Sequence, residues 1–303
     1  MSLLVTGSIG IDTVKTPFGE RKDCLGGSAI YFSLAASFFT PVRFVGAVGE
    51  DCPFDLKNIF AEHDVDLTGL EIRQGSLTFR WAGTYTADMN DRTTDNVELN
   101  ILAEAPPEIP ETYKDSRYVF LANTHPGLQL QLLEKLDGPR LVVADTMNLW
   151  IENERAELIR LMDRIHGLVL NDGEAKLFTG RDNLVTAAKE IIAMGLSFVV
   201  IKKGEHGTLV VNSKNDIFVL PAYPTEAVKD PTGAGDSFAG GMMGHLAAAD
   251  AKPDDFTALK QAVAAGTATA SLVIEDFSLD RWKTAGRKDI DQRFDALRNI
   301  ITF

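Results

Sequence analysis

The sequence predicts an α/β protein in which a doubly wound, mostly parallel sheet is flanked by helices. The main observation is an alternation of short apolar segments, typical of buried strands, with longer segments typical of helices. This order is interrupted over residues 70–101, where β-forming residues predict a small separate sheet. The chain has 303 residues, of which 45% are apolar and 24% charged. It can therefore bury a sizeable core, as one large domain or two smaller ones.

The predicted elements follow one another in a regular order. The strands of the main sheet are expected at 3–9, 42–48, 118–121, 141–144, 168–170, 198–203, 208–211 and 217–220. The helices are expected at 32–39, 53–63, 152–165, 183–194, 237–249, 256–274 and 290–300. The small sheet is expected to contain strands 78–85 and 97–101, with a polar loop over 86–96 between them.

Composition excludes several classes of function. The net charge of −13 disfavours nonspecific binding to nucleic acid or to anionic membranes. No apolar run approaches the roughly eighteen residues that a membrane span requires. Residues 1–8 lack the basic start of a signal peptide. The two cysteines, Cys24 and Cys52, belong to no metal-binding pattern and suggest a reducing compartment. We expect a cytoplasmic protein with no nucleic-acid or membrane partner.

The stretch Lys229–Gly241 carries the strongest chemical signal. Asp230-Pro231 predicts a turn, and Gly233-Ala234-Gly235 permits tight backbone geometry with exposed N–H groups. The helix that follows has small or apolar residues on most sides, which predicts burial. The start of such a helix is an anion site, where Asp236 is a candidate general base for a hydroxyl that attacks a bound phosphate. The alternative for Asp236 is a simple helix cap.

The combination of Asp230, Thr232, Gly233–Asp236 and Gly240-Gly241 resembles the C-terminal signature of the ribokinase-like (PfkB) carbohydrate kinase family. Three further segments are similar to motifs of that family, in the same order. They are the glycine pair Gly26-Gly27, the Asn-x-x-Glu segment 171–174 and the turn 202–207. The resemblance implies a ribokinase-like fold, ATP and Mg²⁺ as cofactors, and a small β-sheet lid.

The resemblance also implies a division of the chain. Residues 1–11, 25–69 and 103–303 would form the main α/β kinase domain, and residues 12–24 and 70–102 would form the lid as a discontinuous insertion. In this family the lid closes over the phosphate acceptor and often forms a dimer face, so a homodimer through the lid is expected.

Several residues are expected to bind the acceptor. Asp12 follows the first strand, where open α/β sheets bind ligands, although a solvated loop is the alternative. Tyr31 replaces the asparagine that the family places four residues after its glycine pair, and its ring could stack on a sugar or a base. Arg80, Trp81 and Tyr85 lie on a predicted lid strand. The expected acceptor-binding residues are Asp12, Gly26, Gly27, Ser28, Tyr31, Arg80, Asn123 and Asp145.

Another group is expected to bind the nucleotide and ions. Asn171 and Glu174 suit Mg²⁺ held through water, and they also match a capping box. The double-glycine turn suits contact with the nucleotide, and Lys203 could balance phosphate charge. The expected nucleotide-binding residues are Asn171, Glu174, Lys203, Gly204, Gly207 and Thr232. In the family, the positions of Asp230 and Thr232 lie near a monovalent cation, which implies potassium there.

The leading hypothesis is an ATP-dependent phosphotransferase acting on a hydroxyl of a small sugar or sugar-like molecule. Asp236 would be the general base, and the amides of Gly233, Ala234 and Gly235 would form the anion hole. The alternatives are a nucleoside kinase of the same fold and a ligand-binding regulator without catalysis. A Gly-Asp-Ser hydrolase is strongly disfavoured because no Asp-x-x-His pair follows Ser237. A P-loop kinase is excluded because no Walker A motif is present.

Overall fold

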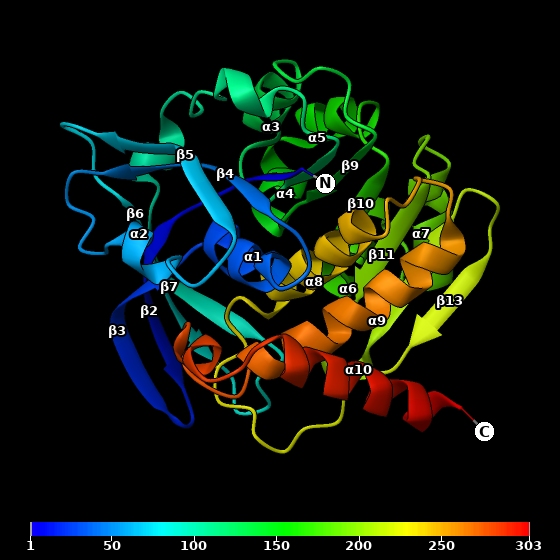
Figure 1. Cartoon of the computed structure of the whole chain (residues 1–303). Coiled ribbons are helices and arrows are strands. Elements are labelled where there is room, and N and C mark those ends of the chain that lie inside the picture. Colours follow the sequence, from blue (N-terminus) through cyan, green and yellow to red (C-terminus); the bar gives the residue numbers. More distant parts are fainter. Residues whose placement is uncertain (1, 303) are drawn as a thin grey trace.

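A large, mostly parallel sheet forms the centre of the protein in the computed structural model, which describes residues 2–302. The nine strands lie in the order β13-β12-β11-β10-β9-β8-β1-β4-β5 (Figure 1). All neighbouring pairs from β11 to β5 are parallel, and β12 and β13 complete the sheet as antiparallel strands. The strands are β1 (Leu3–Thr6), β4 (Val42–Gly49), β5 (Val65–Arg73), β8 (Tyr118–Leu121), β9 (Leu141–Asp145), β10 (Gly167–Asn171), β11 (Phe198–Lys202), β12 (Thr208–Asn212) and β13 (Ile217–Leu220).

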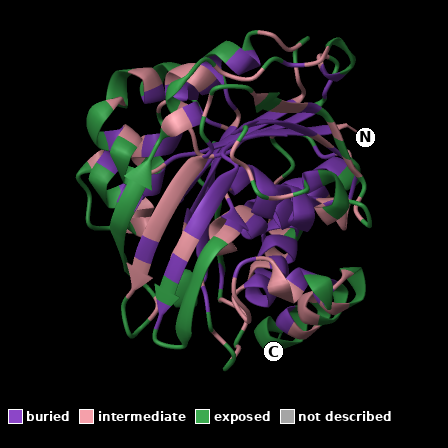
Figure 2. Cartoon of the chain, turned by 90° about the vertical axis from the view of Figure 1, so that its left-hand side faces the viewer, coloured by how far each residue is buried: buried purple, intermediate pink, exposed green. Residues whose placement is uncertain are grey.

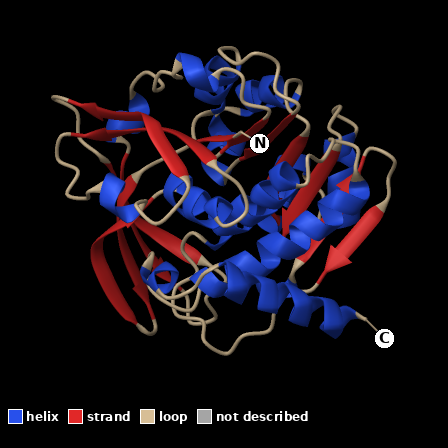
Figure 3. Cartoon of the chain, in the orientation of Figure 1, coloured by secondary structure: helices blue, strands red, loops and turns tan. Residues whose placement is uncertain are grey.

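Helices cover both faces of this sheet, so the doubly wound α/β fold predicted from the sequence is confirmed (Figure 3). One core lies under α1 (Ser28–Ser37), α2 (Leu56–Ile59), α8 (Ala234–Ala248), α9 (Phe256–Val273) and α10 (Arg287–Ile301). The other lies under α3 (Pro126–Leu133), α4 (Asn148–Asn153), α5 (Arg155–Met162), α6 (Asp172–Thr179) and α7 (Leu184–Ile192). Alternate residues of each strand enter the two cores, as the twofold repeat of a strand requires.

A second sheet of four strands lies beside the large one, in the order β3-β2-β6-β7. The strands are β2 (Gly10–Thr16), β3 (Gly19–Gly26), β6 (Phe79–Tyr85) and β7 (Arg92–Glu98). We call this the small sheet. β2 and β6 pair in parallel at its centre, and β7 is exposed along its whole length, in contrast to the buried strands of the large sheet (Figure 2). The division into main domain and lid that the sequence suggested stays a prediction.

Several elements differ from the expected bounds. β7 begins at Arg92, within the segment expected to be a loop. The sequence did not indicate this strand because both of its faces are exposed, and such a strand has no alternation of apolar and polar residues. The helix expected over 53–63 is reduced to α2, which begins where the Asp55 side chain accepts hydrogen bonds from the next turn. The helix expected over 152–165 is two helices, interrupted at Glu154. α3 and α6 are additional helices.

Helix α8 is buried nearly all round, as its small residues predicted. Its close packing on α1 depends on Gly240, where a Cβ atom would lie 2.4 Å from the carbonyl oxygen of Phe32 and 2.8 Å from Cβ of Ala35. We expect Gly240→Ala to lower the free energy of unfolding by about 1–3 kcal/mol, measured by denaturant titration. Gly286→Ala is the control, because no atom lies within 4 Å of its added Cβ. An unchanged stability of Gly240→Ala would contradict this account of the packing.

None of the helices within residues 2–302 is long and apolar enough to cross a membrane.

Candidate active site

The start of α8 lies at the edge of the large sheet where the parallel strands end. Gly233 precedes the helix with a φ of 75°, a conformation that favours glycine. A Cβ atom there would lie 2.3 Å from the ring of Tyr31, so the aromatic ring packs directly beneath this turn. The Tyr31 side chain is only 1% exposed, so its ring is buried beneath the Gly233 backbone. The backbone of Gly233, Ala234 and Gly235 is partly exposed above it.

Asp236 lies in the first turn of α8 and is half-buried. Burial raises the pKa of its carboxyl to about 6, and the nearby charge of Asp145 adds to the rise, whereas Lys202 and Arg92 oppose it. Asp236 forms no hydrogen bond with the side chain of another described residue, and Gly233 provides no side-chain cap. A carboxyl group with a pKa just below neutrality is suited to accept a proton from a hydroxyl.

Lys202, the last residue of β11, extends toward the first turn of α8. Its Nζ atom lies 2.9 Å from the position that a Cβ on Gly235 would occupy, and 3.7 Å from Oδ2 of Asp145. The side chain is 19% exposed. Burial disfavours its charged form, but the carboxylates of Asp145, Glu174 and Asp236 together raise the pKa of Lys202 above its ordinary value. A permanent positive charge therefore lies at the start of α8.

Two carboxyl groups, one at the end of β9 and one in the first turn of α6, complete this charged cluster. Asp145 ends β9, is buried, and accepts a hydrogen bond from the Thr146 amide at 2.9 Å. Burial raises its pKa, and Lys202 opposes the rise. Glu174 forms the expected capping box with Asn171 at the start of α6, with bonds of 2.7 and 2.8 Å. Burial raises the pKa of Glu174 to about 7. The capping-box interpretation of Asn171 and Glu174 is thus confirmed.

Asp12 lies in β2 of the small sheet and not in a loop after the first strand. It is 5% exposed, and burial, with the charges of Asp230 and Asp236, raises its pKa to about 7. Its carboxylate lies against Gly26, where a Cβ atom would be 1.8 Å from Oδ2. The Oδ1 atom of Asp12 is buried and has no hydrogen-bond partner among the described residues. An acceptor hydroxyl would supply the missing partner.

The backbone between β3 and α1 is equally tight. Gly27 has a φ of 99°, and a Cβ on it would lie 2.5 Å from the carbonyl oxygen of Ser8. The amide of Ser28 donates to Oγ of Ser8 at 3.0 Å, and the amide of Ser8 donates to Oγ of Ser28 at 3.1 Å. The Ser8 and Ser28 side chains therefore join the connection from β1 to β2 with the connection from β3 to α1.

Asp230 holds the loop before α8. It is 1% exposed, and its two oxygens accept hydrogen bonds from the amides of Thr232 at 2.9 Å and Ser278 at 3.1 Å. Burial raises its pKa. The Thr232 hydroxyl donates to the hydroxyl of Tyr85 in β6 at 3.2 Å. Both residues of the expected monovalent-cation site thus shape this loop.

The remaining expected site residues have contacts of their own in the structure. Arg80 pairs with Asp51 at 3.2 Å and Asp23 at 3.5 Å. The Asn123 side chain accepts a hydrogen bond from Trp150 at 2.9 Å. Lys203 extends past the strand, and its amide donates to the carbonyl of Gly207 across the turn. Gly204 and Gly207 have φ values of 53° and 78°, as this tight turn requires.

Sequence reasoning selected Lys203 and missed Lys202. The signal was present in the twofold repeat of β11, because Phe198 and Val200 face the core beneath α8 and α9. Lys202 continues that series, and Val199 and Ile201 face the opposite core. The lysine on the α8 face is therefore the one that reaches the helix start.

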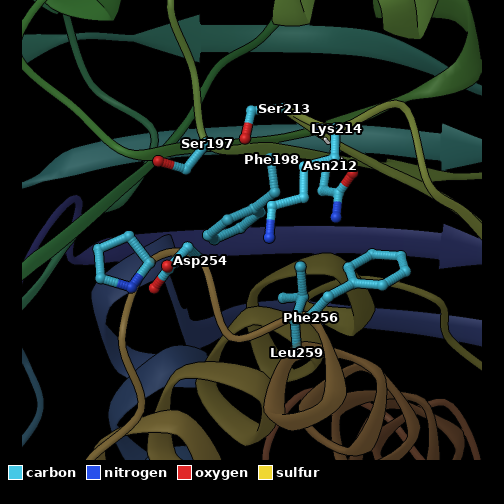
Figure 4. A pocket seen from close by; sticks show the side chains of 9 residues that line it. Ser197, Phe198, Asn212, Ser213, Lys214, Asp254, Phe256 and Leu259 are labelled. Atoms are coloured by element: carbon cyan, nitrogen blue, oxygen red, sulfur yellow. Dashed lines mark hydrogen bonds between the residues drawn. The ribbon is translucent and has the colours of Figure 1, made fainter.

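A small cavity lies at the opposite end of β11, away from this cluster (Figure 4). It is lined by Ser197, Phe198, Asn212 and residues near the start of α9. Phe198 begins the strand that Lys202 ends, so this cavity belongs to another region of the fold.

Comparison with known proteins identifies the family of the chain. Residues 25–282 match the pfkB family carbohydrate kinases. The chain belongs to this family. This pfkB kinase is 32% identical to the cytidine kinase of Thermococcus kodakarensis over 249 residues, which cover 80% of this chain and 87% of that protein.

Two solved structures show the same ribokinase-like fold. The Burkholderia thailandensis nucleoside kinase, in complex with inosine, covers 99% of both chains with a TM-score of 0.77 and 20% identity. Ribokinase from Thermotoga maritima covers 97% of this chain and 99% of its own, with a TM-score of 0.73 and 21% identity. The pfkB kinase is therefore a phosphotransferase of an ATP-utilising family whose members phosphorylate sugars or nucleosides.

Proposed function

We propose that this pfkB kinase transfers the terminal phosphoryl group of ATP to a hydroxyl of a nucleoside, with a small sugar as the second candidate acceptor. The main support for phosphoryl transfer is that the Asp236 carboxyl and the Lys202 ammonium group both lie at the start of α8. The similarity to a cytidine kinase over most of the chain favours a nucleoside. The buried Oδ1 atom of Asp12, which has no hydrogen-bond partner among the described residues, provides a place for an acceptor hydroxyl.

In the proposed mechanism, Asp236 accepts the proton of the acceptor hydroxyl while the hydroxyl oxygen attacks the γ-phosphorus. The bond from this phosphorus to the β-phosphate oxygen breaks, and ADP leaves with that electron pair. The amides of Gly233, Ala234 and Gly235 and the ammonium group of Lys202 stabilise the negative charge on the transferred group. Asp12 orients the acceptor, and Asp145 positions Lys202 through their ion pair.

The residues present fit the expected Mg²⁺. Asn171 and Glu174 offer an amide oxygen and a carboxylate, and burial without a full counter-charge raises the pKa of Glu174 to about 7. No group of three or more acidic, histidine or cysteine side chains within residues 2–302 forms a complete metal site, which suits an ion held partly by water and phosphate. Bound Mg²⁺ would neutralise phosphate charge. A potassium ion near Asp230 and Thr232 and a homodimer through the small sheet remain proposals.

The pH dependence follows from the raised pKa of Asp236. Above about pH 6 the carboxylate is ionised and accepts the proton, and below that pH it is protonated. We expect kcat/KM for the acceptor to fall about tenfold per pH unit on the acid side of pH 6. Rates between about pH 3.5 and pH 8 measure this, with circular dichroism at each pH to confirm that the fold persists. A fall beginning only near pH 4, the ordinary range of an aspartate, would contradict the assignment.

An acceptor panel tests the proposed substrate class. Cytidine, inosine, adenosine, ribose, fructose phosphate and a 2-keto sugar are each supplied with ATP and Mg²⁺, and ADP formation is measured. We expect a nucleoside to give the highest kcat/KM. A sugar with the highest value would select the second candidate, and ligand binding without ADP formation would indicate a regulator.

A further inference from the structure

A hairpin of the small sheet extends over the candidate active site. β6 and β7 are joined by residues 86–91, and Tyr85 pairs with Arg92 where the hairpin begins. The Tyr85 hydroxyl accepts a hydrogen bond from Thr232, in the loop before α8. At the tip, Nδ2 of Asn90 donates to Oε1 of Glu205 at 3.0 Å, in the turn that follows Lys202. The hairpin is therefore held at two points, on the loop before α8 and on the turn after β11.

Arg92 is the arginine of this hairpin that lies opposite Tyr85. Its Cζ atom lies 5.7 Å from the centroid of the Trp81 ring, so its aliphatic stem and its charge are held against an aromatic surface. Within residues 2–302 the guanidinium forms neither an ion pair nor a hydrogen bond, although the small sheet's other arginines, Arg21 and Arg80, both pair with carboxylates. Its five N–H donors thus remain available for a ligand.

The charge of Arg92 acts on the same groups as Lys202. It lowers the pKa of Asp236 and of Glu174 against the effect of burial, and it lowers the pKa of Tyr85. Tyr85 and Arg92 also lie directly opposite each other on paired strands, so both side chains are on the face of the hairpin from which the Tyr85 hydroxyl contacts Thr232. A planar guanidinium is well suited to bind two phosphate oxygens at once. In a protein of net charge −13, an anionic ligand requires such local cations.

We propose that Arg92 is a phosphate-binding residue carried by the small sheet, and that its guanidinium contacts the terminal phosphoryl group of a bound nucleoside triphosphate beside Lys202 and Asp236. This inference rests on the proposed phosphotransferase function. It makes the phosphoryl site a composite, with the anion hole and Lys202 from the large sheet's side and Arg92 from the small sheet.

Binding measurements test the contact without any acceptor. Isothermal calorimetry compares ADP with a non-hydrolysable ATP analogue for the wild type, Arg92→Ala and Arg92→Lys. Because only the analogue has the terminal phosphate, we expect Arg92→Ala to weaken the analogue about tenfold and ADP less than about threefold, with Arg92→Lys between. Arg21→Ala is the matched control, since Arg21 lies in the same sheet and pairs with Asp280. An equal loss for both nucleotides, or no loss, overturns the proposal.

Kinetics provide the second measurement. We expect Arg92→Ala to lower kcat about 100-fold with little change in KM for the acceptor, and to move the acid limb of the pH profile to higher pH, because a positive charge near Asp236 is removed. A raised KM with unchanged kcat and pH profile would make Arg92 an acceptor-binding or merely structural residue. If the wild type phosphorylates no acceptor, the proposed function fails, and the comparison of the two nucleotides still decides the role of Arg92.

Discussion

Asp236→Asn is expected to lower kcat about 1000-fold while leaving the affinity for a non-hydrolysable ATP analogue nearly unchanged. Asparagine has almost the same shape as aspartate but cannot accept the proton of the acceptor hydroxyl. Removing a negative charge from the phosphate site also does nothing to weaken an anionic ligand. Steady-state rates of ADP formation and calorimetry with the analogue measure the two quantities.

The control for Asp236 is another carboxylate in the first turn of a helix. Asp289 accepts a hydrogen bond from the Gly286 amide at 2.9 Å at the start of α10 and lies outside the proposed site. Asp289→Asn should keep full activity and lose at most about 1 kcal/mol of stability. If Asp236→Asn behaves like Asp289→Asn, the aspartate is only a helix-end residue and the proposed base is wrong.

Lys202→Met is expected to lower kcat about 100-fold to 1000-fold, because a cation that stabilises the transferred phosphoryl group is lost. The buried carboxylates of Asp145 and Glu174 would also lose their shared counter-charge. We therefore expect the variant to be less stable at pH 7 than at pH 6, since protonation relieves two unpaired buried charges. Rates on the folded protein and thermal unfolding at both pH values measure these effects.

Lys189→Met provides the control for Lys202, because Lys189 is an exposed lysine of α7. It should change neither kcat nor the pH dependence of stability. Lys203→Met compares the two adjacent lysines directly. Loss of activity in Lys203→Met together with wild-type rates in Lys202→Met would reverse the roles that we assign to them.

Most of the fold was predictable because its strands are buried on both faces and its helices have clear apolar patterns. The buried helix α8, with Asp236 at its start, could be predicted because a run of small and apolar residues on nearly all sides of a helix indicates burial. β7 could not be found in this way, since an exposed edge strand such as Arg92–Glu98 carries no apolar alternation. Arg92 was therefore hidden in an expected loop.

Side-chain direction was harder to predict than position. Lys202 and Lys203 are adjacent, and only the face of the strand decides which one enters the site. Tyr31 occupies a position where the family commonly has an asparagine, but its ring packs beneath Gly233. The sequence could not reveal this contact, because the two residues are about 200 positions apart and meet only when α1 and α8 pack together.

The connections between the two sheets have a mechanical consequence. β2 follows β1 after three residues, β3 enters α1 after Gly27 alone, and Ser8 and Ser28 bond these two connections to each other. The segment 74–78 between β5 and β6 and the segment after β7 also join the small sheet to the rest of the chain, so any swing of the small sheet must bend all four connections, two of which are this cross-linked pair. Asp12 and Arg92 would travel together on the swinging part, while Asp236 and Lys202 stay with the frame. Acceptor capture and completion of the phosphate site would then be one and the same movement.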